Sequence, residues 1–218
     1  MLDVLVAVAL FATAFLLGSI PFGLIISKVF YHTDIREHGS GNIGTTNAIR
    51  TIGKVGGYSV FVLDFGKGLL SGFLAWLFCW FFLPGGGLAP GATVTYDTML
   101  AVAFLGCVWG HIFSPWLGFK GGKGIAVAVG CLFVTYGWAG ACLELLIFIV
   151  LVVATKHVSV GSIAAAAACP FFGLYFFWGD WAAVACCTLA GLTVVWAHRE
   201  NIARLRAGTE SRIGDKKK

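Results

Sequence analysis

Long apolar stretches, each about the length needed to cross a bilayer, constrain the fold of this 218-residue chain more than any other feature. A transmembrane helix needs about 20 predominantly apolar residues. Charged residues make up only 11% of the chain, whereas soluble domains contain about 25%. The sequence therefore predicts a single all-α polytopic membrane domain over residues 1–218. The five clear spans are Val4–Val29, Val55–Leu83, Thr98–Phe113, Ser159–Trp178 and Trp181–Ala197.

The segment from Ile125 to Thr155 decides how many times the chain crosses the membrane. It is apolar, but Tyr136-Gly137-Trp138-Ala139-Gly140 interrupts it near the middle. We expect two short helices that turn at these glycines, which gives about seven transmembrane helices. One long bent helix, or a re-entrant pair, is the alternative and would bring the number of spans closer to five.

The basic residues predict the orientation. All 15 Lys and Arg residues except Lys67 lie in or beside the connections 30–54, 114–124 and 156–158 and the tail from residue 199. The alternating connections 84–97, 137–140 and 179–180 contain none. Because cytoplasmic loops are enriched in Lys and Arg, we expect the N-terminus outside and the C-terminus in the cytoplasm. A single helix across 125–155 would spoil this pattern, so the charges favour two helices there.

Three polar runs stand out from the apolar background, and all fall on the predicted cytoplasmic side. Each follows an apolar stretch closely and carries cations beside glycine or amide side chains. Converging backbone amides, together with Lys and Arg, are groups that bind phosphates. We therefore expect the runs to form one cationic, phosphate-binding pocket at the lipid surface. They cover residues 38–50, 114–124 and 198–205.

The first run combines glycines with hydroxyl and amide side chains and ends at Arg50. Glycine permits positive φ and close approach of a ligand to the backbone, and the planar guanidinium of arginine matches a phosphate. A polar turn that only satisfies its own backbone is the plainer explanation, but so many donors beside one arginine favour a binding site. The candidates in this run are Ser40, Gly41, Asn42, Thr46, Asn47 and Arg50.

The second run contains Gly118-Phe119-Lys120-Gly121-Gly122-Lys123-Gly124 and leads into a predicted helix. Amides at a helix N-terminus attract anions, so we expect a loop that cradles phosphate. The spacing does not match a nucleotide-binding P-loop, and Gly124 stands where a Ser or Thr would hold magnesium. We therefore expect no metal and no other cofactor; two lysines that merely obey the charge rule are the alternative. The candidates are Lys120, Gly121, Gly122, Lys123 and Gly124.

The third run places His198 and Asn201 on one face of a helix, because residues three apart are neighbours on its surface. The histidine can carry a proton, donate to a phosphate, or be only an interfacial residue. Arginines in this run are expected at the cytoplasmic surface whatever the function. We take His198 and Asn201 as candidate catalytic residues, together with Ser40 and Arg50.

Two ionisable residues within the second span, Asp64 and Lys67, are also three residues apart. Ionisable groups inside a bilayer are costly and mark functional sites by default. Lys67 is therefore a candidate substrate-binding residue, although pairing with Asp64 as a structural lock is an equally good explanation. His111, beside the second run, is more simply explained as a histidine hydrogen-bonded between helices.

Together the runs resemble the motifs of a known family, the bacterial acyl-phosphate:glycerol-3-phosphate acyltransferases (the PlsY family). The first resembles its Ser-Gly-Asn…Arg motif and the second its Gly-Phe-Lys-Gly-Gly-Lys-Gly loop. The third resembles His-Arg-x-Asn-Ile-x-Arg-Leu-x-x-Gly-x-Glu, which continues here to Gly208 and Glu210. An Asp-x-x-Lys-Gly element also matches at Asp64, Lys67 and Gly68. The resemblance covers nearly the whole chain, in order.

The resemblance implies a multi-pass enzyme of the bacterial cell (inner) membrane with its active site on the cytoplasmic face. Such an enzyme moves a fatty acyl group from acyl phosphate to the 1-hydroxyl of glycerol 3-phosphate, giving lysophosphatidic acid and inorganic phosphate. This is the first acylation of bacterial phospholipid synthesis. The implied partners are the two substrates and membrane lipid, with the acyl-phosphate-forming enzyme as a further candidate; no nucleic acid is implied.

The sequence leaves the proton acceptor for the glycerol hydroxyl open. Soluble-type glycerolipid acyltransferases orient a histidine with an aspartate that follows it by five residues, and no such pair exists here. We hypothesise that a substrate phosphate oxygen is the base and that His198 donates to the phosphate site; proton transfer to His198 is the alternative. Donors such as Asn42, Asn201 or loop amides are expected to stabilise the oxyanion.

Two other functions compete with acyl transfer. A transporter for a phosphorylated metabolite would share the cationic vestibule, but the outer connections lack matching cations and no inverted repeat is visible. A phosphotransferase acting on CDP-alcohols would need a cluster of metal-binding aspartates, whereas the aspartates here are scattered along the chain.

Overall fold

The computed structural model describes residues 2–82 and 94–214, and within these ranges the chain is helical with no β-strand. The predicted helix end at Leu83, most of the 84–97 connection and residues 215–218 lie outside the described residues. Two 3₁₀ turns, η1 (Ile35–Glu37) and η2 (Pro115–Leu117), lie in connections. The α-helices are α1 (Leu2–Ser19), α2 (Phe22–Tyr31), α3 (Thr45–Phe82), α4 (Tyr96–Ile112), α5 (Ile125–Thr135), α6 (Gly137–Thr155), α7 (Val158–Phe176), α8 (Trp181–Ala197) and α9 (Arg199–Arg206).

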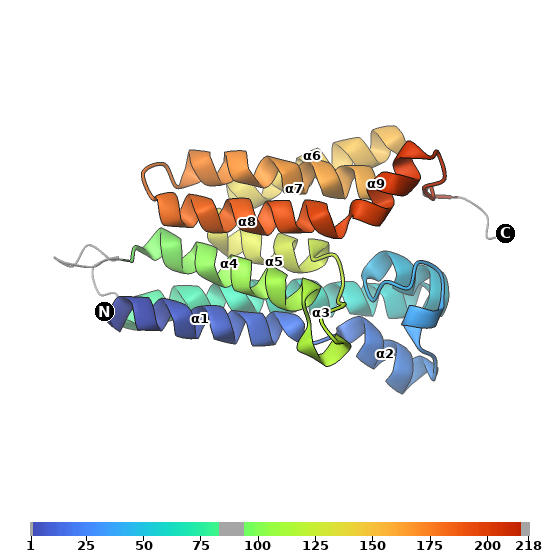
Figure 1. Ribbon diagram of the computed structural model, residues 1–218, viewed down its shortest axis with the longest axis horizontal. Coiled ribbons are helices and arrows are strands. Elements are labelled where there is room, and N and C mark those ends of the chain that lie inside the picture. The colour runs from blue at the N-terminus through green and yellow to red at the C-terminus, as the bar shows by residue number, and fades with distance from the viewer. Residues whose placement is uncertain (1, 83–93, 215–218) are drawn as a thin grey trace.

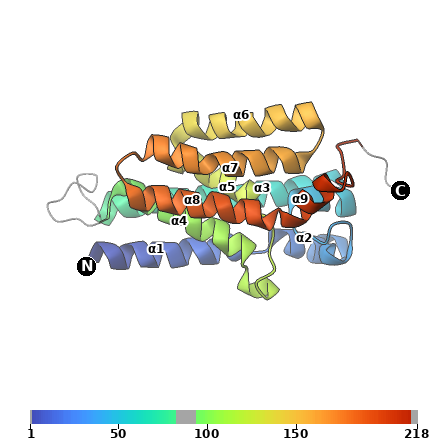
Figure 2. The same cartoon turned by 45° about the horizontal axis from the view of Figure 1, so that its top comes forward.

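The long helices lie side by side along one axis, with the start of α1 at one end of the bundle and α9 at the other (Figure 1). The central helix is α4, which packs against α1, α3, α5 and α8 and is mostly buried. In Figure 2, α6 and α7 form a layer on one side of the bundle and α1 lies on the opposite side. Small residues permit close helix packing in membranes. At Gly130 of α5, for example, an added Cβ would lie 2.1 Å from the Phe65 carbonyl oxygen.

The predicted all-helical membrane architecture is confirmed. Among the described residues, five helical segments are long and apolar enough to cross a membrane, and α8 with α9, bent by 51°, is a sixth candidate. The division of residues 125–155 into two helices is also confirmed, because α5 ends at Thr135 and α6 begins at Gly137, which has a φ of 66°. With only 11 residues, α5 is too short to cross a bilayer alone. The number of seven spans and their orientation stay predictions.

The first predicted span is two helices rather than one. Pro21 separates α1 from α2, and since proline has no N–H it cannot continue the hydrogen-bond ladder of α1. Two carbonyls beside the break accept hydrogen bonds from other segments instead. Ser114 Oγ donates to the Ser19 carbonyl over 2.7 Å, and Lys67 Nζ donates to the Ile20 carbonyl over 2.8 Å. The apolar composition continues unchanged through the break, so it carries no signal for it.

The next helix starts earlier than the sequence predicted. α3 begins at Thr45, inside the first polar run, rather than at Val55. Just before it, the Gly44 amide donates to the Asn42 side chain over 2.9 Å, a local turn typical of asparagine. Gly53 interrupts the helical geometry with a φ of 85°. The polar first turns of α3 therefore form a segment distinct from its apolar membrane part.

The three polar runs gather at one end of the bundle. The end of α2 and the start of α3, the end of α4, and the junction of α8 with α9 all lie at that end, whereas α3 and α7 end at the opposite one (Figure 1). The predicted topology requires this common end. It brings segments that are far apart in the sequence close enough to share one site.

Replacing Gly130 with alanine should destabilise the protein, because the new methyl group would press on the backbone of α3. Overpacking of this kind costs about 1–3 kcal/mol. Gly66 of α3 is the matched control, since an added Cβ there meets nothing within 4 Å. Thermal unfolding in one detergent should show a lower apparent melting temperature for Gly130→Ala but not for Gly66→Ala. Equal melting temperatures would mean that the close α3–α5 contact does not support the fold.

Candidate functional site

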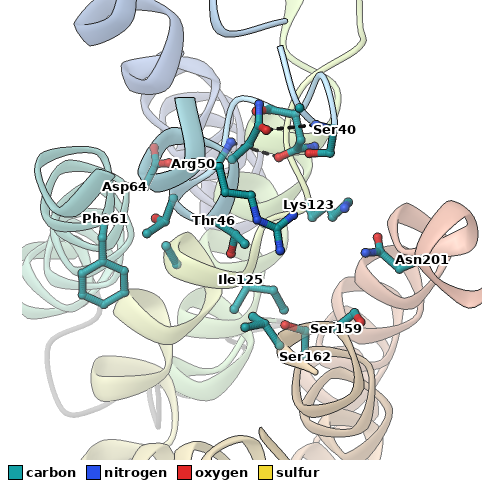
Figure 3. A pocket seen from close by; sticks show the side chains of 18 of the residues that line it. Ser40, Thr46, Arg50, Phe61, Asp64, Lys123, Ile125, Ser159, Ser162 and Asn201 are labelled. Carbon is teal, nitrogen blue, oxygen red and sulfur yellow. Dashed lines mark hydrogen bonds between the residues drawn. The ribbon is translucent and has the colours of Figure 1, made fainter. Parts of the chain in front are cut away.

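A large cavity lies where the three polar runs meet. Its volume is about 1390 Å³, larger than the roughly 300–1,000 Å³ of most small-molecule sites, so it has room for two ligands or for one with a long tail. Figure 3 shows side chains from α3 and α5 facing others from α7 and α9. The three runs therefore share one pocket, as the sequence predicted. The predicted site residues that line it are Ser40, Asn42, Thr46, Asn47, Arg50, Lys123, Gly124, His198 and Asn201.

The N-termini of α3 and α5, together with the guanidinium of Arg50, give the cavity a positive end. Thr45 and Thr46 in the first turn of α3, and Ile125 and Ala126 in the first turn of α5, line it. First-turn amides have no acceptor within their own helix, so they favour an anion. The Arg50 guanidinium extends from α3 into the cavity (Figure 3). No carboxylate of the described residues lies within ion-pair distance of it.

Asn47 holds the first run in place rather than facing a ligand. Its buried Nδ2 lies 3.1, 3.0 and 2.9 Å from the carbonyl oxygens of Ile35, His38 and Asn42. Its Oδ1 accepts from the Ser40 amide over 2.9 Å. All the polar atoms of this side chain are therefore used inside the protein. This corrects the substrate-binding role predicted for Asn47: it positions Ser40, whose hydroxyl is left to face the cavity.

In the second run, Gly121 and Gly122 do not offer their amides to the cavity. The Gly121 amide donates to the Ile112 carbonyl over 2.9 Å and the Gly122 amide to the His111 carbonyl over 3.0 Å, so both close the end of α4. Lys120 is exposed and, like both glycines, is not among the residues that line the cavity. The glycines are needed for packing, since an added Cβ at Gly121 would lie 2.0 Å from the His111 carbonyl oxygen. These three residues are therefore corrected from ligand-binding to structural positions.

From the second run, Lys123 and Gly124 do line the cavity. Burial, and then repulsion by Arg204, lower the pKa of the Lys123 ammonium, so this lysine loses its charge at a lower pH than an exposed one. Gly124 precedes α5 with a φ of 84°, which favours glycine. Gly41 of the first run does not line the cavity, and its amide donates to the His38 carbonyl over 3.0 Å.

His198, between α8 and α9, is oriented by a backbone carbonyl. Its Nδ1 lies 2.8 Å from the Val194 carbonyl oxygen, which can only accept, so Nδ1 carries a proton. In the neutral ring Nε2 is then an acceptor. His198 is buried and lines the cavity. The hypothesis that it donates to a phosphate would require the doubly protonated ring, whereas the neutral ring offers an acceptor.

Glu210 fixes the third run, although the sequence analysis gave it no role beyond its place at the end of the third motif. Its carboxylate accepts from Asn201 Nδ2 over 2.6 Å and from Arg204 Nε over 2.7 Å. Glu210 therefore holds one N–H of Asn201 Nδ2, and the second N–H of this amide stays available as a donor. Asn201 Oδ1 is buried and has no partner among the described residues. Asn201 thus offers an acceptor at the cavity wall.

Lys67 lies beside the cavity and is not among the residues that line it. Its ammonium is 2.8 Å from Asp64 Oδ1, 2.8 Å from the Ile20 carbonyl oxygen and 3.0 Å from His111 Nδ1. It is only 3% exposed. The substrate contact predicted for Lys67 is therefore corrected to the structural pairing with Asp64. Asp64 and His111 themselves do line the cavity.

One part of the cavity wall is apolar. Phe61 lies well away from Asn201 in Figure 3. The apolar and the polar side chains therefore line different parts of the cavity. The sequence does not single out these apolar residues, because their helices are apolar on every face. The cavity is therefore amphiphilic, with cations and donors in one part and hydrocarbon in another. The apolar residues come from α3, α5 and α6 and are Phe61, Phe65, Val129, Phe133, Leu145 and Phe148.

Phosphate binding should weaken at alkaline pH as Lys123 loses its proton, because its pKa is lowered. The expected result is a phosphate dissociation constant that rises at a lower pH than the value of about 10.4 near which an exposed lysine titrates. Lys123→Arg is the matched variant, since arginine stays charged at these pH values, and its dissociation constant should stay nearly constant. Calorimetric titration with inorganic phosphate measures both. The same pH course in the two proteins would exclude Lys123 as a phosphate ligand.

Comparison with known proteins gives a consistent result over nearly the whole chain. The family model of glycerol-3-phosphate acyltransferase matches residues 8–208. The chain is 40% identical over 210 residues to a glycerol-3-phosphate acyltransferase of Rhodopseudomonas palustris, covering 96% of this chain and 97% of the relative. The similarly named protein of Thermosynechococcus vestitus is 39% identical over 204 residues, covering 92% of each.

Solved structures agree with the sequence relatives. The crystal structure of PlsY, an integral membrane glycerol 3-phosphate acyltransferase, in its glycerol 3-phosphate form gives a TM-score of 0.80 at 35% identity and covers 95% of this chain and 96% of that one. Its lysophosphatidic acid form gives a TM-score of 0.76 at 33% identity, covering 94% of each chain. This chain is therefore an integral membrane protein that belongs to the glycerol-3-phosphate acyltransferase family.

Proposed function

We propose that this protein transfers a fatty acyl group from acyl phosphate to the 1-hydroxyl of glycerol 3-phosphate, releasing lysophosphatidic acid and inorganic phosphate. The observation that carries the proposal is the amphiphilic cavity, in which Arg50, Lys123 and two helix N-termini share one space with an apolar wall. Both substrates are phosphates and one has a lipid tail. The relatives named glycerol-3-phosphate acyltransferase and the glycerol 3-phosphate and lysophosphatidic acid forms of PlsY support the acceptor and the product.

The proposed setting is the bacterial cell membrane, with the cavity on the cytoplasmic face. The enrichment of Lys and Arg at the connections around the cavity supports this orientation. Acyl phosphate would enter with its tail against Phe65 and Phe133 and its phosphate toward Arg50. Glycerol 3-phosphate is water-soluble and would enter from the aqueous side. The enzyme that forms acyl phosphate is the proposed partner, since its product is a reactive lipid.

The proposed reaction is an acyl transfer between two oxygens. The glycerol hydroxyl oxygen bonds to the acyl carbonyl carbon, the bond from that carbon to the phosphate oxygen breaks, and the hydroxyl proton leaves on the released phosphate. Acyl phosphate is a mixed anhydride with a good leaving group, so positioning supplies much of the rate. Held reactants can gain about 7–11 kcal/mol in this way. Ser40, Thr46 and Arg50 would hold the phosphates, with Lys123 and the first amides of α5.

The acceptors on the cavity wall would align the glycerol. His198 Nε2 accepts a hydrogen bond from the 1-hydroxyl, a role that the Val194 carbonyl supports by holding the proton on Nδ1. This differs from the phosphate donor hypothesised from the sequence, while the substrate phosphate keeps its place as the final proton acceptor. Asn201 Oδ1, which has no partner among the described residues, accepts from the second hydroxyl of the glycerol.

The deciding experiment measures phosphate release by the purified protein from palmitoyl phosphate, with and without glycerol 3-phosphate. Palmitoyl-CoA is the control donor. We expect release that depends on glycerol 3-phosphate, a lysophosphatidate product and no activity with palmitoyl-CoA. If folded protein releases no phosphate, the proposal fails. Uptake of glycerol 3-phosphate into proteoliposomes, without chemical change, would then indicate transport.

Arg50→Ala should lower kcat/KM by about 10²–10³-fold, the usual loss when a donor to developing charge is removed. Arg50→Lys should recover only a small part of that loss, because an ammonium is a point charge and cannot make the paired contacts of a planar guanidinium. Lys54→Ala, one turn further along the same segment, is the matched control for surface charge and should retain activity. Full activity in Arg50→Lys would refute the two-contact role of the guanidinium.

A further inference from the structure

Glu144 is an ionisable residue near the middle of α6 for which the mechanism above has no use. It is buried, with 4% of its surface exposed. Ionisable groups within a membrane-spanning helix are costly and mark functional positions by default. Among the described residues, no Lys, Arg or His lies within ion-pair distance of its carboxyl. Pairing with a cation, which accounts for Asp64, therefore does not account for Glu144.

Glu144 lines a second, smaller cavity of about 40 Å³, which we call the inner branch. It lies where α6 and α7, the outer layer in Figure 2, meet α4, α5 and α8. It adjoins the main cavity, since Ile125, Val129, Leu145 and Phe148 line both. A hydrocarbon chain that starts in the main cavity therefore has two apolar surfaces to follow. One is the inner branch, and the other is the apolar wall of the main cavity.

The carboxyl of Glu144 has an unsatisfied oxygen beside the inner branch. Its Oε1 is buried and has no hydrogen-bond partner among the described residues. The Cys169 thiol interacts with the carboxyl, but a thiol is a weak donor, and this one also donates to the Cys187 carbonyl over 3.4 Å. Buried polar atoms nearly always have a partner, either protein or ordered water. At about 10–15 Å³ for each water molecule, the inner branch has room for roughly three.

We infer that Glu144 is a positioning residue for the acyl tail: it binds water in the inner branch and so keeps the tail out of it. Hydrocarbon that entered the branch would displace this water and leave Oε1 unpaired, which is costly. The tail then lies along the aromatic wall formed by Phe61, Phe65 and Phe133, whose successive ring centroids are 5.9 Å apart. The inference rests on the proposed function, which places a lipid tail in the main cavity.

Photolabelling locates the tail directly in the purified protein, without acyl transfer. The probe is an octyl phosphonate with a diazirine at the end of its tail. Its length suits the inner branch, because Gly191 lies about 10 Å from His198 along α8. Mass spectrometry of fragments compares label on the aromatic wall with label on Glu144 and on the inner-branch residues of α7 and α8. We expect the parent protein to be labelled mainly at the aromatic wall, and label mainly in the inner branch would overturn the inference.

Glu144→Leu should redirect the tail, because it replaces the carboxyl with a hydrocarbon side chain of similar size. The ratio of inner-branch label to aromatic-wall label should rise about 5- to 150-fold, the range expected when a buried polar group no longer has hydrogen bonds to lose. Glu144→Gln is the matched control, since its amide has a similar shape and still binds water, and its ratio should stay near that of the parent. An unchanged ratio in Glu144→Leu would overturn the inference.

Thermal unfolding separates this role from a merely structural one. A buried polar group that lacks a protein partner contributes little to stability, because its desolvation opposes folding. We therefore expect Glu144→Leu to melt at or above the temperature of the parent protein in the same detergent. A clearly lower melting temperature would show that the carboxyl holds the helices together, and would overturn the inference in favour of a structural role.

A crystal structure of the parent protein, at a resolution that shows ordered water, tests the water directly. We expect a water molecule within hydrogen-bond distance of Glu144 Oε1. Hydrocarbon in the inner branch, or a protein group bonded to Oε1, would overturn the inference. Absence of acyl transfer by the parent protein would instead count against the proposed function and leave the labelling and crystallographic results intact.

Discussion

The requirement to satisfy polar groups without water is the constraint on which the rest of this structure depends. In the hydrocarbon region each unpaired backbone group costs several kcal/mol, and the break at Pro21 interrupts the helix beside the carbonyls of Ser19 and Ile20. Lys67 from α3 and Ser114 beyond α4 donate to them. The same lysine also contacts Asp64 and His111. One cation therefore closes the end of α1, joins α3 to α4 and neutralises a carboxylate that would otherwise be alone.

The positive part of the cavity is built from a few cations and many fixed dipoles. Residues that look like ligands in the sequence, such as Asn47 and Gly121, are used to hold the backbone, and they leave other groups free. Glu210 acts in the same way, since it holds one N–H of Asn201 and leaves the Oδ1 acceptor without a partner among the described residues. The site thus presents defined donors and defined acceptors rather than a general positive surface. Such a site can discriminate between a phosphate oxygen and a hydroxyl proton.

Much of this organisation could be predicted from the sequence, and the errors have common causes. Hydropathy identified the apolar helices, although it merged α1 with α2, and the glycines correctly divided residues 125–155. Both signals are local properties of the sequence. The distribution of Lys and Arg among the connections correctly predicted that the three polar runs lie together. The break at Pro21 has a local signal, because proline cannot continue a helix, but hydropathy alone does not show it. The bonds made by the amides of Gly121 and Gly122 could not be predicted, since they depend on how the run folds back on the end of α4. The roles of Asn47 and Lys67 were misjudged for the same reason: composition shows that a donor exists, not which acceptor it meets.

The short length of α5 has a consequence for how a ligand with a lipid tail reaches and leaves the cavity. Its 11 residues make about 17 Å of helix, roughly half of the ~30 Å hydrocarbon core, and its apolar residues Val129 and Phe133 line the cavity. A ligand with its tail along this half-span keeps the tail at the depth of one leaflet. Such a ligand arrives and departs by lateral diffusion in two dimensions and need not be extracted from the bilayer. Its occupancy of the cavity is then set by its mole fraction in that leaflet, not by its concentration in water.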